Sequence, residues 1–581
     1  MTFNWTYKRA LAAAVFIMLV MLTKNVIDQY DDLLSANLPN PDSYYKLVLI
    51  KDYEPAHGFQ YIARDNAPEG SWIHWSIPHT WTVMQLHKGL MLFGVESEKA
   101  LLMAGGGLTI FCMLLLAIFV AVTVLNIGSN LAAVLSVLAL ATSFPLFGYG
   151  QLLQITHHIY MLVPIAAACM FFFLKDMQTR KSFDFLGGLL LGLAIWISPE
   201  TMPLVLAIAA ARAALQLQQS SPTFLWPAAV GLMLMLTVGW LIDPPPPTFE
   251  SWALDHISLA WLLFGVLVSA LMLIADLCVY RGVSFLRSLL VLSGSLIVCF
   301  GVWLLTVPGA LSGPSGLVTL ELKELWWSQI NELQSISKPS QYIAYLTIPL
   351  LAGCWLLYIS WREQKLWLAV VSLTVITYGV LGAVYIRMGA ASSLISAIAF
   401  GVCISRLRVF SIDRDSIALP MQDQLFGAFI VLLLPLHVFV VTGLASLETA
   451  KQSENNCLLN DVVDGFVDLP QGVVMLPVNY GPELLYKTYH SIVAGNYHHN
   501  ASGILDVINF FRASNTDEVV DTLNKREAVY IAFCNGEFIS SDSFLIAGVD
   551  GELPDWLVNL ELDGSTNWTV YNAKTENLSP R

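Results

Sequence analysis

The sequence predicts a polytopic α-helical membrane protein that ends in a soluble α/β domain, and three observations support this. Of its 581 residues, 56% are hydrophobic and 12% are charged, with a mean hydropathy of +0.64. Soluble domains carry about 25% charged residues. The apolar residues fall in runs of roughly 20, the length that crosses a bilayer, whereas the C-terminal part is polar and acidic. This composition excludes a disordered chain, a nucleic-acid-binding protein and an ordinary soluble enzyme.

The apolar runs predict about thirteen transmembrane helices. Lys8 and Arg9 precede the first run, which lacks a small-residue cleavage site, so we expect a retained helix rather than a signal peptide. The predicted spans are residues 10–27, 100–125, 131–148, 157–174, 183–198, 201–215, 224–242, 257–279, 288–306, 341–360, 366–386, 389–405 and 424–446.

The basic residues predict a cytoplasmic N-terminus and an extracytoplasmic C-terminus. With Lys8 and Arg9 inside, four further basic clusters fall on the same side when the spans alternate, as the positive-inside rule requires. They are Lys175, Arg180 and Lys181; Arg281 and Arg287; Arg362 and Lys365; and Arg406, Arg408 and Arg414. The longest polar loop, residues 28–99, then faces outside, and we expect a multi-pass protein of the inner (plasma) membrane.

Two domains are expected: a membrane domain, 1–446, and an extracytoplasmic domain, 447–581. The second holds 19 acidic and 7 basic residues, a net charge of −12 out of −14 for the chain. This charge disfavours docking on anionic lipid or nucleic acid. Buried strands are predicted at Gly472–Val478 and Ala528–Phe533, and an amphipathic helix at Ile504–Ala513.

Six of the eight cysteines lie in predicted spans, where they serve as small apolar side chains. The other two, Cys457 and Cys534, share the outer domain. An oxidising compartment favours a disulfide between them, and two free thiols are the alternative.

Asp42 is the first candidate for chemistry, because it follows Pro41 just beyond the first span, at the edge of the membrane. It could bind a metal or act as a base towards an acceptor hydroxyl. Alternatively, it caps a helix. Nearby, Lys51 and Asp52 could form a solvated ion pair, and Trp72, Trp75 and Trp81 could form an interfacial aromatic belt.

Three further polar sites lie at the same predicted face of the membrane. His157 and His158 begin the fourth span and suit a metal or a phosphate oxygen, or simply packing at the rim. Glu200 sits between two apolar helices, where a carboxylate is costly unless it is functional or caps the next helix. Arg387 suits a lipid-linked phosphate, or it extends its charge to lipid headgroups.

This clustering favours an enzyme that acts on a lipid-anchored substrate. A transporter typically places ionisable residues near the midplane of the bilayer. In this sequence charges within the spans are scarce, and Asp276 is close to the inner end of its predicted helix.

Several motifs together resemble the glycosyltransferase C superfamily. Within it, the sequence is similar to the oligosaccharyltransferase catalytic-subunit-like branch, and most of all to a group of bacterial membrane proteins in that branch. The resemblance is strongest over residues 38–205 and returns near 480–510. The matching motifs are Pro41-Asp42-Ser43-Tyr44, Arg64-x-Asn66-x-Pro68-x-Gly70, His74-Trp75-Ser76, His157-His158, Glu200-Thr201-x-Pro203 and Tyr497-His498-x-Asn500.

The sequence departs from that group's pattern at several positions. Asn40 and Thr156 stand where the group has aspartates, and His499 replaces an arginine. The Trp-Trp-Asp-Tyr-Gly motif by which oligosaccharyltransferases recognise acceptor peptides is absent, since Trp326-Trp327 is followed by Ser-Gln. Asparagine-linked protein glycosylation is therefore not expected.

The resemblance implies a glycosyltransferase that takes a sugar or oligosaccharide from a polyprenyl-phosphate-type donor and passes it to an unknown glycan, lipid or protein acceptor at the outer face. Asp42 would be catalytic. His157, His158 and Glu200 would hold a divalent cation, Mg or Mn, or the phosphate. The residues expected to bind substrate or phosphate are Arg387, Tyr44, Arg64, His74 and His498. Two alternatives remain open: a transporter or flippase of a lipid-linked saccharide, and a non-catalytic relative that binds polyprenyl phosphate.

Overall fold

The computed structural model describes residues 5–173, 181–218, 224–313, 316, 318–407, 421–449, 457, 459–534, 543–545, 554–562 and 567–574. Contacts within the chain divide it into two compact units. We call residues 1–31, 106–316 and 328–451 the membrane unit, and residues 32–105, 317–327 and 452–581 the loop–tail unit. The first long loop and the C-terminal tail, far apart in sequence, therefore fold together.

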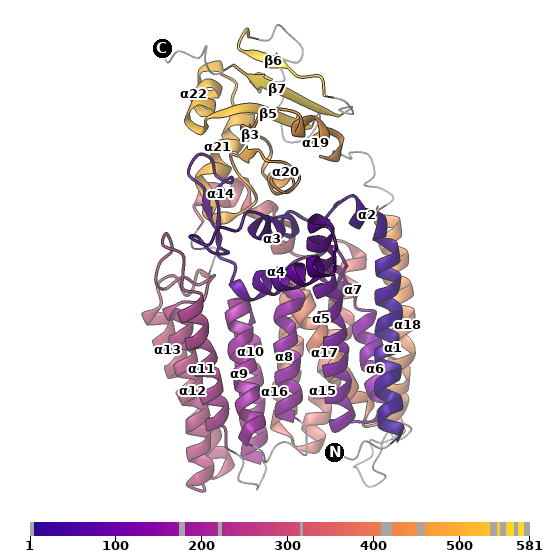
Figure 1. Ribbon diagram of the computed structural model, residues 1–581. Coiled ribbons are helices and arrows are strands. Elements are labelled where there is room, and N and C mark those ends of the chain that lie inside the picture. The colour runs from indigo at the N-terminus through magenta and orange to yellow at the C-terminus, as the bar shows by residue number, and fades with distance from the viewer. Residues whose placement is uncertain are drawn as a thin grey trace. The chain divides into compact units, whose positions relative to one another are not determined.

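The membrane unit consists of helices that stand side by side (Figure 1). Each of the thirteen predicted spans contains a helix. In order they are α1 (Trp5–Asp28), α5 (Ser97–Ile127), α6 (Asn130–Ala141) with α7 (Phe144–Tyr149), α8 (His157–Phe173), α9 (Lys181–Ile197), α10 (Met202–Gln218), α11 (Trp226–Ile242), α12 (Leu259–Tyr280), α13 (Phe285–Thr306), α15 (Pro339–Glu363), α16 (Leu366–Val384), α17 (Gly389–Ile404) and α18 (Met421–Thr449).

Among the described residues, nine helices are long and apolar enough to cross a membrane, while α6, α8 and α11 are apolar but shorter. The multi-pass membrane class is thus confirmed, and the number of thirteen spans stays a prediction. Three short 3-10 turns matter below because they join these helices or precede them: η1 (Pro199–Thr201), η4 (Asn331–Leu333) and η5 (Ile386–Met388).

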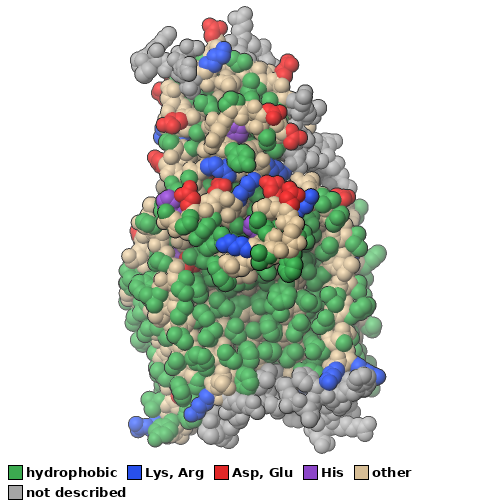
Figure 2. Space-filling view, viewed as in Figure 1, with side chains coloured by type: hydrophobic (Ala, Val, Ile, Leu, Met, Phe, Trp, Pro, Cys, Tyr) green, Lys and Arg blue, Asp and Glu red, His purple; other side chains and the backbone are tan. Residues whose placement is uncertain are grey.

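The flank of the helices is apolar, as Figure 2 shows. On α13, Leu290, Ile297 and Leu305 are 65%, 72% and 91% exposed. An apolar surface of this extent is stable against lipid but not against water. Lys and Arg side chains gather at the end of the bundle where α1 begins. Lys175, Arg180, Arg408 and Arg414 from the predicted inside clusters lie outside the described residues.

Close packing of α9 against α11 depends on two glycines. A Cβ atom at Gly188 would lie 1.9 Å from the Ala228 carbonyl oxygen, and one at Gly231 would lie 2.2 Å from the Phe185 oxygen. Small residues at such contacts let the backbones of membrane helices approach one another.

The loop–tail unit is built around a mixed five-stranded sheet with the order β4-β3-β5-β7-β6. Strand β3 pairs in parallel with β4 and β5, and β7 pairs antiparallel with β5 and β6. The strands are β3 (Val473–Met475), β4 (Ser491–Ile492), β5 (Ala528–Cys534), β6 (Leu557–Asn559) and β7 (Trp568–Ala573), and a separate hairpin pairs β1 (Tyr61–Ile62) with β2 (Ser71–Trp72).

Among the residues of this unit that the structure describes, seven more helices occur, several of them around the sheet (Figure 1). They are α3 (Pro41–Lys51), α4 (Ile77–Leu92), α14 (Leu320–Leu325), α19 (Asn460–Val467), α20 (Gly481–Lys487), α21 (Ala501–Arg512) and α22 (Thr516–Arg526). A further short helix, α2 (Tyr30–Leu34), begins just before the unit.

The predicted α/β character of the tail is confirmed. The expected strands correspond to β3 and β5, and the expected amphipathic helix to α21. The sheet core is apolar, with Val474, Ile531 and Phe533 buried, and Phe511 of α21 packs with its ring centroid 6.2 Å from that of Phe533. Cys457 and Cys534 form the disulfide that the sequence favoured over two free thiols.

Candidate functional site

Asp42 lies in the first turn of α3, and its side chain is not the helix cap. Asn40 is the N-cap, and its side-chain oxygen accepts a hydrogen bond from the Ser43 backbone N–H at 2.8 Å. Pro41 opens the helix, where its missing N–H costs nothing. Asp42 Oδ1 instead accepts a hydrogen bond from Asn496 Nδ2 at 3.2 Å. The capping alternative therefore applies to Asn40, and the carboxylate of Asp42 is half-buried.

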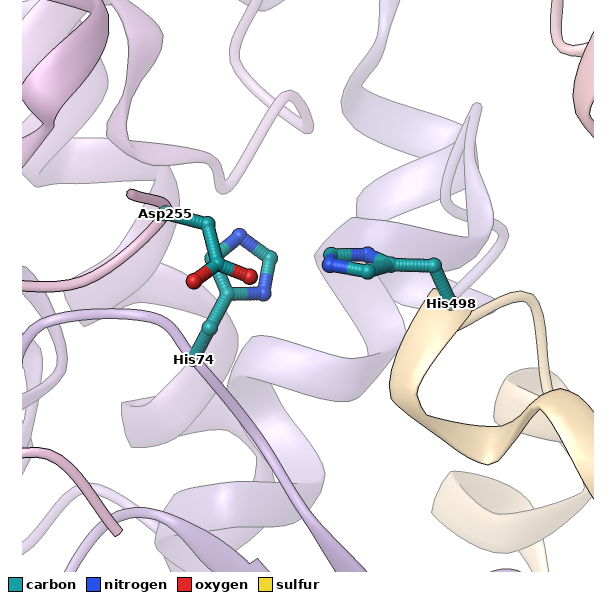
Figure 3. Close-up of side chains that lie close together, drawn as sticks. All are labelled: His74, Asp255 and His498. Carbon is teal, nitrogen blue, oxygen red and sulfur yellow. The ribbon is translucent and has the colours of Figure 1, made fainter. Parts of the chain in front are cut away.

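His74 and His498 lie together in the loop–tail unit, with ring centroids 4.9 Å apart (Figure 3). Asp255, drawn in the same view, belongs to the membrane unit. Tyr497 orients His74, because its hydroxyl oxygen accepts from the His74 backbone N–H and lies 2.5 Å from His74 Nδ1. This contact at Nδ1 fixes the orientation of the imidazole ring.

Arg64 is committed to contacts within the loop–tail unit. Its Nε and Nη2 donate to the two oxygens of Asp52, each at 2.9 Å. Nη1 donates to the carbonyl oxygens of Thr488 and His490, and Nη2 also donates to that of Leu485. These bonds use all five guanidinium donors, so the geometry favours a role in joining the first loop to the tail over a phosphate contact.

Tyr44 is also committed to contacts inside this unit. Its hydroxyl donates to the Ala36 carbonyl oxygen at 3.0 Å and accepts from the Leu38 N–H at 2.9 Å. Burial raises the pKa of Tyr44, which keeps the hydroxyl neutral. This geometry favours a structural role over the substrate contact that the sequence suggested.

Neighbouring alternatives from the sequence are also resolved. Lys51 forms no solvated pair with Asp52, since Arg64 takes that carboxylate and Lys51 donates to the Tyr486 carbonyl oxygen at 2.8 Å. Trp75 is buried, with the Lys46 ammonium 4.2 Å from its ring centroid. Trp75 therefore belongs to the core of the unit rather than to an interfacial belt.

In the membrane unit, Glu200 and Arg387 form an ion pair. Each lies in a 3-10 turn between two helices: Glu200 in η1 between α9 and α10, and Arg387 in η5 between α16 and α17. Pro199 interrupts the first helix and so creates the turn. In this pairing Glu200 does more than favour the start of α10, and Arg387 contacts a carboxylate.

Glu332 of η4 joins this group. Its Oε2 lies 3.7 Å from His158 Nε2, at the start of α8. Burial raises the pKa of Glu332, and the charge of Arg387 opposes this while that of Glu200 adds to it. We call Tyr149, His158, Glu200, Glu332 and Arg387 the Arg387 cluster; Tyr149 contacts His158 with ring centroids 4.7 Å apart.

A small pocket opens beside the ion pair. Its free space of about 270 Å³ includes the solvent at its mouth. Glu200, Tyr378 and Arg387 line it together with apolar side chains from α8, α10 and α17. Charged groups with an apolar wall suit a ligand that has an anionic head and a hydrocarbon chain.

The donors near His158 fit a divalent cation in part. An imidazole nitrogen and a carboxylate oxygen suit Mn²⁺ or Zn²⁺ better than Mg²⁺, which prefers oxygen ligands. His157 packs beside His158, with ring centroids 4.7 Å apart. A cation held by Glu200 would meet the positive charge of Arg387, so His158 and Glu332 are the better pair of donors. Thr156 carries a hydroxyl where the resemblance expects a carboxylate, and its Oγ1 is buried without a hydrogen-bond partner among the described residues.

No protein-family model and no curated protein matches the sequence. Solved structures do match. The oligosaccharyltransferase AglB from Archaeoglobus fulgidus, in complex with an inhibitory peptide and a dolichol-phosphate, aligns with a TM-score of 0.65 and 13% identity over 92% of this chain and 70% of that one. This protein has an oligosaccharyltransferase fold.

Two further structures of the archaeal enzyme agree. One, in complex with Zn and sulfate, aligns with a TM-score of 0.61 and 13% identity, covering 90% of this chain and 68% of that one. The other, tethered to an acceptor peptide with the NVT sequon, gives 0.61 and 14%, covering 92% and 69%. The resemblance drawn from the motifs is confirmed at the level of fold.

Within this oligosaccharyltransferase fold, the structure links residues that sequence reasoning had not connected. It joins Glu200 to Arg387, His74 to His498, and Asp42 to the segment before His498. Glu332 was missed because it sits in a polar loop with no motif around it. Asn496 was missed too, although its position next to Tyr497-His498 was an available signal.

Proposed function

We propose that this protein is a membrane glycosyltransferase that moves a sugar or oligosaccharide from a polyprenyl-phosphate-type donor to an acceptor at the outer face of the membrane. The observation that carries the proposal is the oligosaccharyltransferase fold, which spans 92% of the chain. One structure with that fold is bound to a dolichol-phosphate and another to an acceptor peptide, which supports a lipid-linked donor.

Arg387 is the residue proposed to receive the donor phosphate. Its guanidinium is always charged, and its fork matches two phosphate oxygens. Glu200 binds one guanidinium nitrogen of Arg387 in the absence of donor, and would give way to the leaving phosphate as that phosphate gains a second negative charge. When the sugar–phosphate bond breaks, negative charge grows on the leaving oxygen, and a preorganised cation lowers the energy of that state.

Asp42 is the residue proposed to act on the acceptor. Asp42 is half-buried and does not cap the helix. Such a carboxylate can orient an acceptor hydroxyl or amide and take up its proton as the bond between acceptor and sugar forms. His74 and His498 would line the acceptor or donor side of the same unit.

A divalent cation is proposed near His158 and Glu332, with His157 adjacent. Such a cation would stabilise the charge of the leaving phosphate. The solved relative in complex with Zn and sulfate supports a divalent metal in this fold.

The test is sugar transfer from a radiolabelled polyprenyl-linked donor in membranes that carry wild type or Asp42→Ala. We expect transfer with wild type and a loss of at least about 100-fold with the variant, as for removal of a general base. Bilayer crossing of the donor without bond cleavage would establish a flippase instead. Donor binding without turnover in the wild type would establish a non-catalytic relative, the reading that Thr156 favours.

The proposed topology has its own test. Ser514 in the tail and Ser284 between α12 and α13 are both exposed. In intact cells, a membrane-impermeant maleimide should label Ser514→Cys but not Ser284→Cys. The reverse pattern would put the tail in the cytoplasm and remove the proposed outer-face reaction.

A further inference from the structure

Residues 495–500, which we call the docking segment, contact the first loop at nearly every position. The Gly495 N–H donates to Asp65 Oδ1 at 3.1 Å, and Asn500 Nδ2 donates to the same oxygen at 3.1 Å. Between them, Asn496 reaches Asp42 and Tyr497 reaches His74. All these contacts lie within the loop–tail unit and join residues more than 420 positions apart.

Asn496 has the chemistry of an orienting partner for Asp42. Its amide donates one hydrogen bond to Oδ1 of the carboxylate at 3.2 Å, which limits rotation of the carboxylate. A neutral donor stabilises the charged carboxylate less than a lysine or arginine would. Asn496 can therefore orient Asp42 without adding a charge beside it.

Asp65 anchors both ends of the docking segment. Its side chain is fully buried, and it accepts from Tyr45 Oη at 2.8 Å and the Asn66 N–H at 2.8 Å, besides the two bonds from the segment. A buried carboxylate is tolerated only when its oxygens are hydrogen-bonded. Undocking the segment would remove two of these four donors, so burial of Asp65 and docking favour each other.

The fit at Gly495 is close enough to exclude any side chain. A Cβ atom there would lie 1.8 Å from Tyr45 Oη and 2.5 Å from Cζ of the same ring. The tyrosine that donates to Asp65 thus also sets the depth at which the segment docks.

We propose that the docking segment is a positioning element of the reaction, in which Asn496 orients the Asp42 carboxylate and Asp65 holds the segment in place. The inference rests on the proposed function, because Asp42 is the catalytic residue only under that function. Asn496 and Asp65 are positioning residues that act through Asp42.

Two substitutions at Asn496 separate orientation from packing. Asn496→Ala should lower kcat for sugar transfer by about 10- to 100-fold, the usual cost of losing an orienting partner, with the KM for donor changed less than about twofold. Asn496→Asp keeps the shape but places a second carboxylate beside Asp42, and should be at least as damaging. If the residue only fills space, the aspartate variant will be the milder one, and the inference fails. Asn559→Ala, at an exposed position on β6, is the control.

Hydrogen–deuterium exchange of the full-length protein tests the anchor without relying on activity. Asp65→Asn should speed exchange at residues 493–500, and the reciprocal pair Asp65→Asn with Asn500→Asp should restore protection and transfer together. Unchanged exchange in Asp65→Asn would refute the anchor, whatever the activity. Wild-type protein that lacks transfer but shows the expected exchange would refute the proposed function and leave the docking intact.

Discussion

The membrane unit and the loop–tail unit hold their polar side chains in place by different kinds of contact. The membrane unit keeps few charges and joins them in pairs, as Glu200 with Arg387 and His158 with Glu332. The loop–tail unit uses a dense network of hydrogen bonds in which Arg64 and Asp65 each collect four or more partners. An unpaired charge in hydrocarbon has a high free-energy cost, so charges there occur in pairs. A unit outside the hydrocarbon can hold larger hydrogen-bond networks.

This contrast predicts that the loop–tail unit depends on its cross-link for stability, while the membrane unit does not. Cys457 and Cys534 are separated by 77 residues, and closing a loop of that size is worth about 4 kcal/mol. The double variant Cys457→Ser with Cys534→Ser should lower the thermal unfolding midpoint of the loop–tail unit. The measurement is proteolysis of the tail as a function of temperature. Cys354→Ser, an exposed position on α15, is the control. Equal midpoints in the two variants would contradict the prediction.

In the membrane unit, substitution of Arg387 should reduce activity rather than stability. Arg387→Ala should reduce transfer by about 100- to 1,000-fold, or roughly 3–4 kcal/mol of transition-state stabilisation. Arg387→Lys should fall between this variant and wild type, because lysine keeps the charge but not the fork. Arg362→Ala, exposed on α15, should have little effect. Full activity in Arg387→Ala would remove this residue from the reaction.

The network of the loop–tail unit should also respond to pH through Asp65. Burial raises the pKa of Asp65 to about 6 from its ordinary value of 3.8, and its hydrogen bonds oppose that rise. The folded state then binds the proton more tightly than the unfolded state, so stability should fall as pH rises from about 4 to 6, by at most about 3 kcal/mol.

Thermal melts of wild type and Asp65→Asn across this pH range measure the effect. The slope present in wild type should be absent from the variant, and Asp555→Asn, at an exposed position, should keep it. A slope that survives in Asp65→Asn must come from other groups.

The smallest effect is expected for Glu332→Gln, which tests whether the pairing of Glu332 with His158 contributes to the reaction. Glu332→Gln keeps the shape but removes the charge next to His158, and should lower transfer by about 10-fold, or 1.4 kcal/mol. It should also weaken activation by added Mn²⁺. Glu250→Gln, an exposed carboxylate of the same unit, is the control. An identical Mn²⁺ response in the two variants would exclude Glu332 as a donor.

Most of the architecture could be predicted from sequence because its causes are local. A run of about 20 apolar residues forms a helix in a membrane whatever its neighbours do, so each predicted span contains a helix. Strands β3 and β5 and helix α21 were visible in their own periodicity. The disulfide followed from the two cysteines that remained outside the spans.

The sites were harder to predict because their partners are distant in sequence. Local patterns indicated Glu200 and Arg387 separately, but nothing in either segment showed that they form a pair. Arg64 matched a motif of the resemblance, but nothing in that motif showed that three carbonyl oxygens of the tail accept from its guanidinium. Glu332 had no local signal at all.

By itself, then, the sequence determined the membrane class, the α/β tail and the candidate residues, since hydrophobicity and periodicity act over a single turn, strand or span. Only the tertiary structure decided that Asn40 rather than Asp42 caps α3 and that the docking segment meets the first loop. Hydrogen bonds reach about 3 Å, and only folding brings such distant residues within that range.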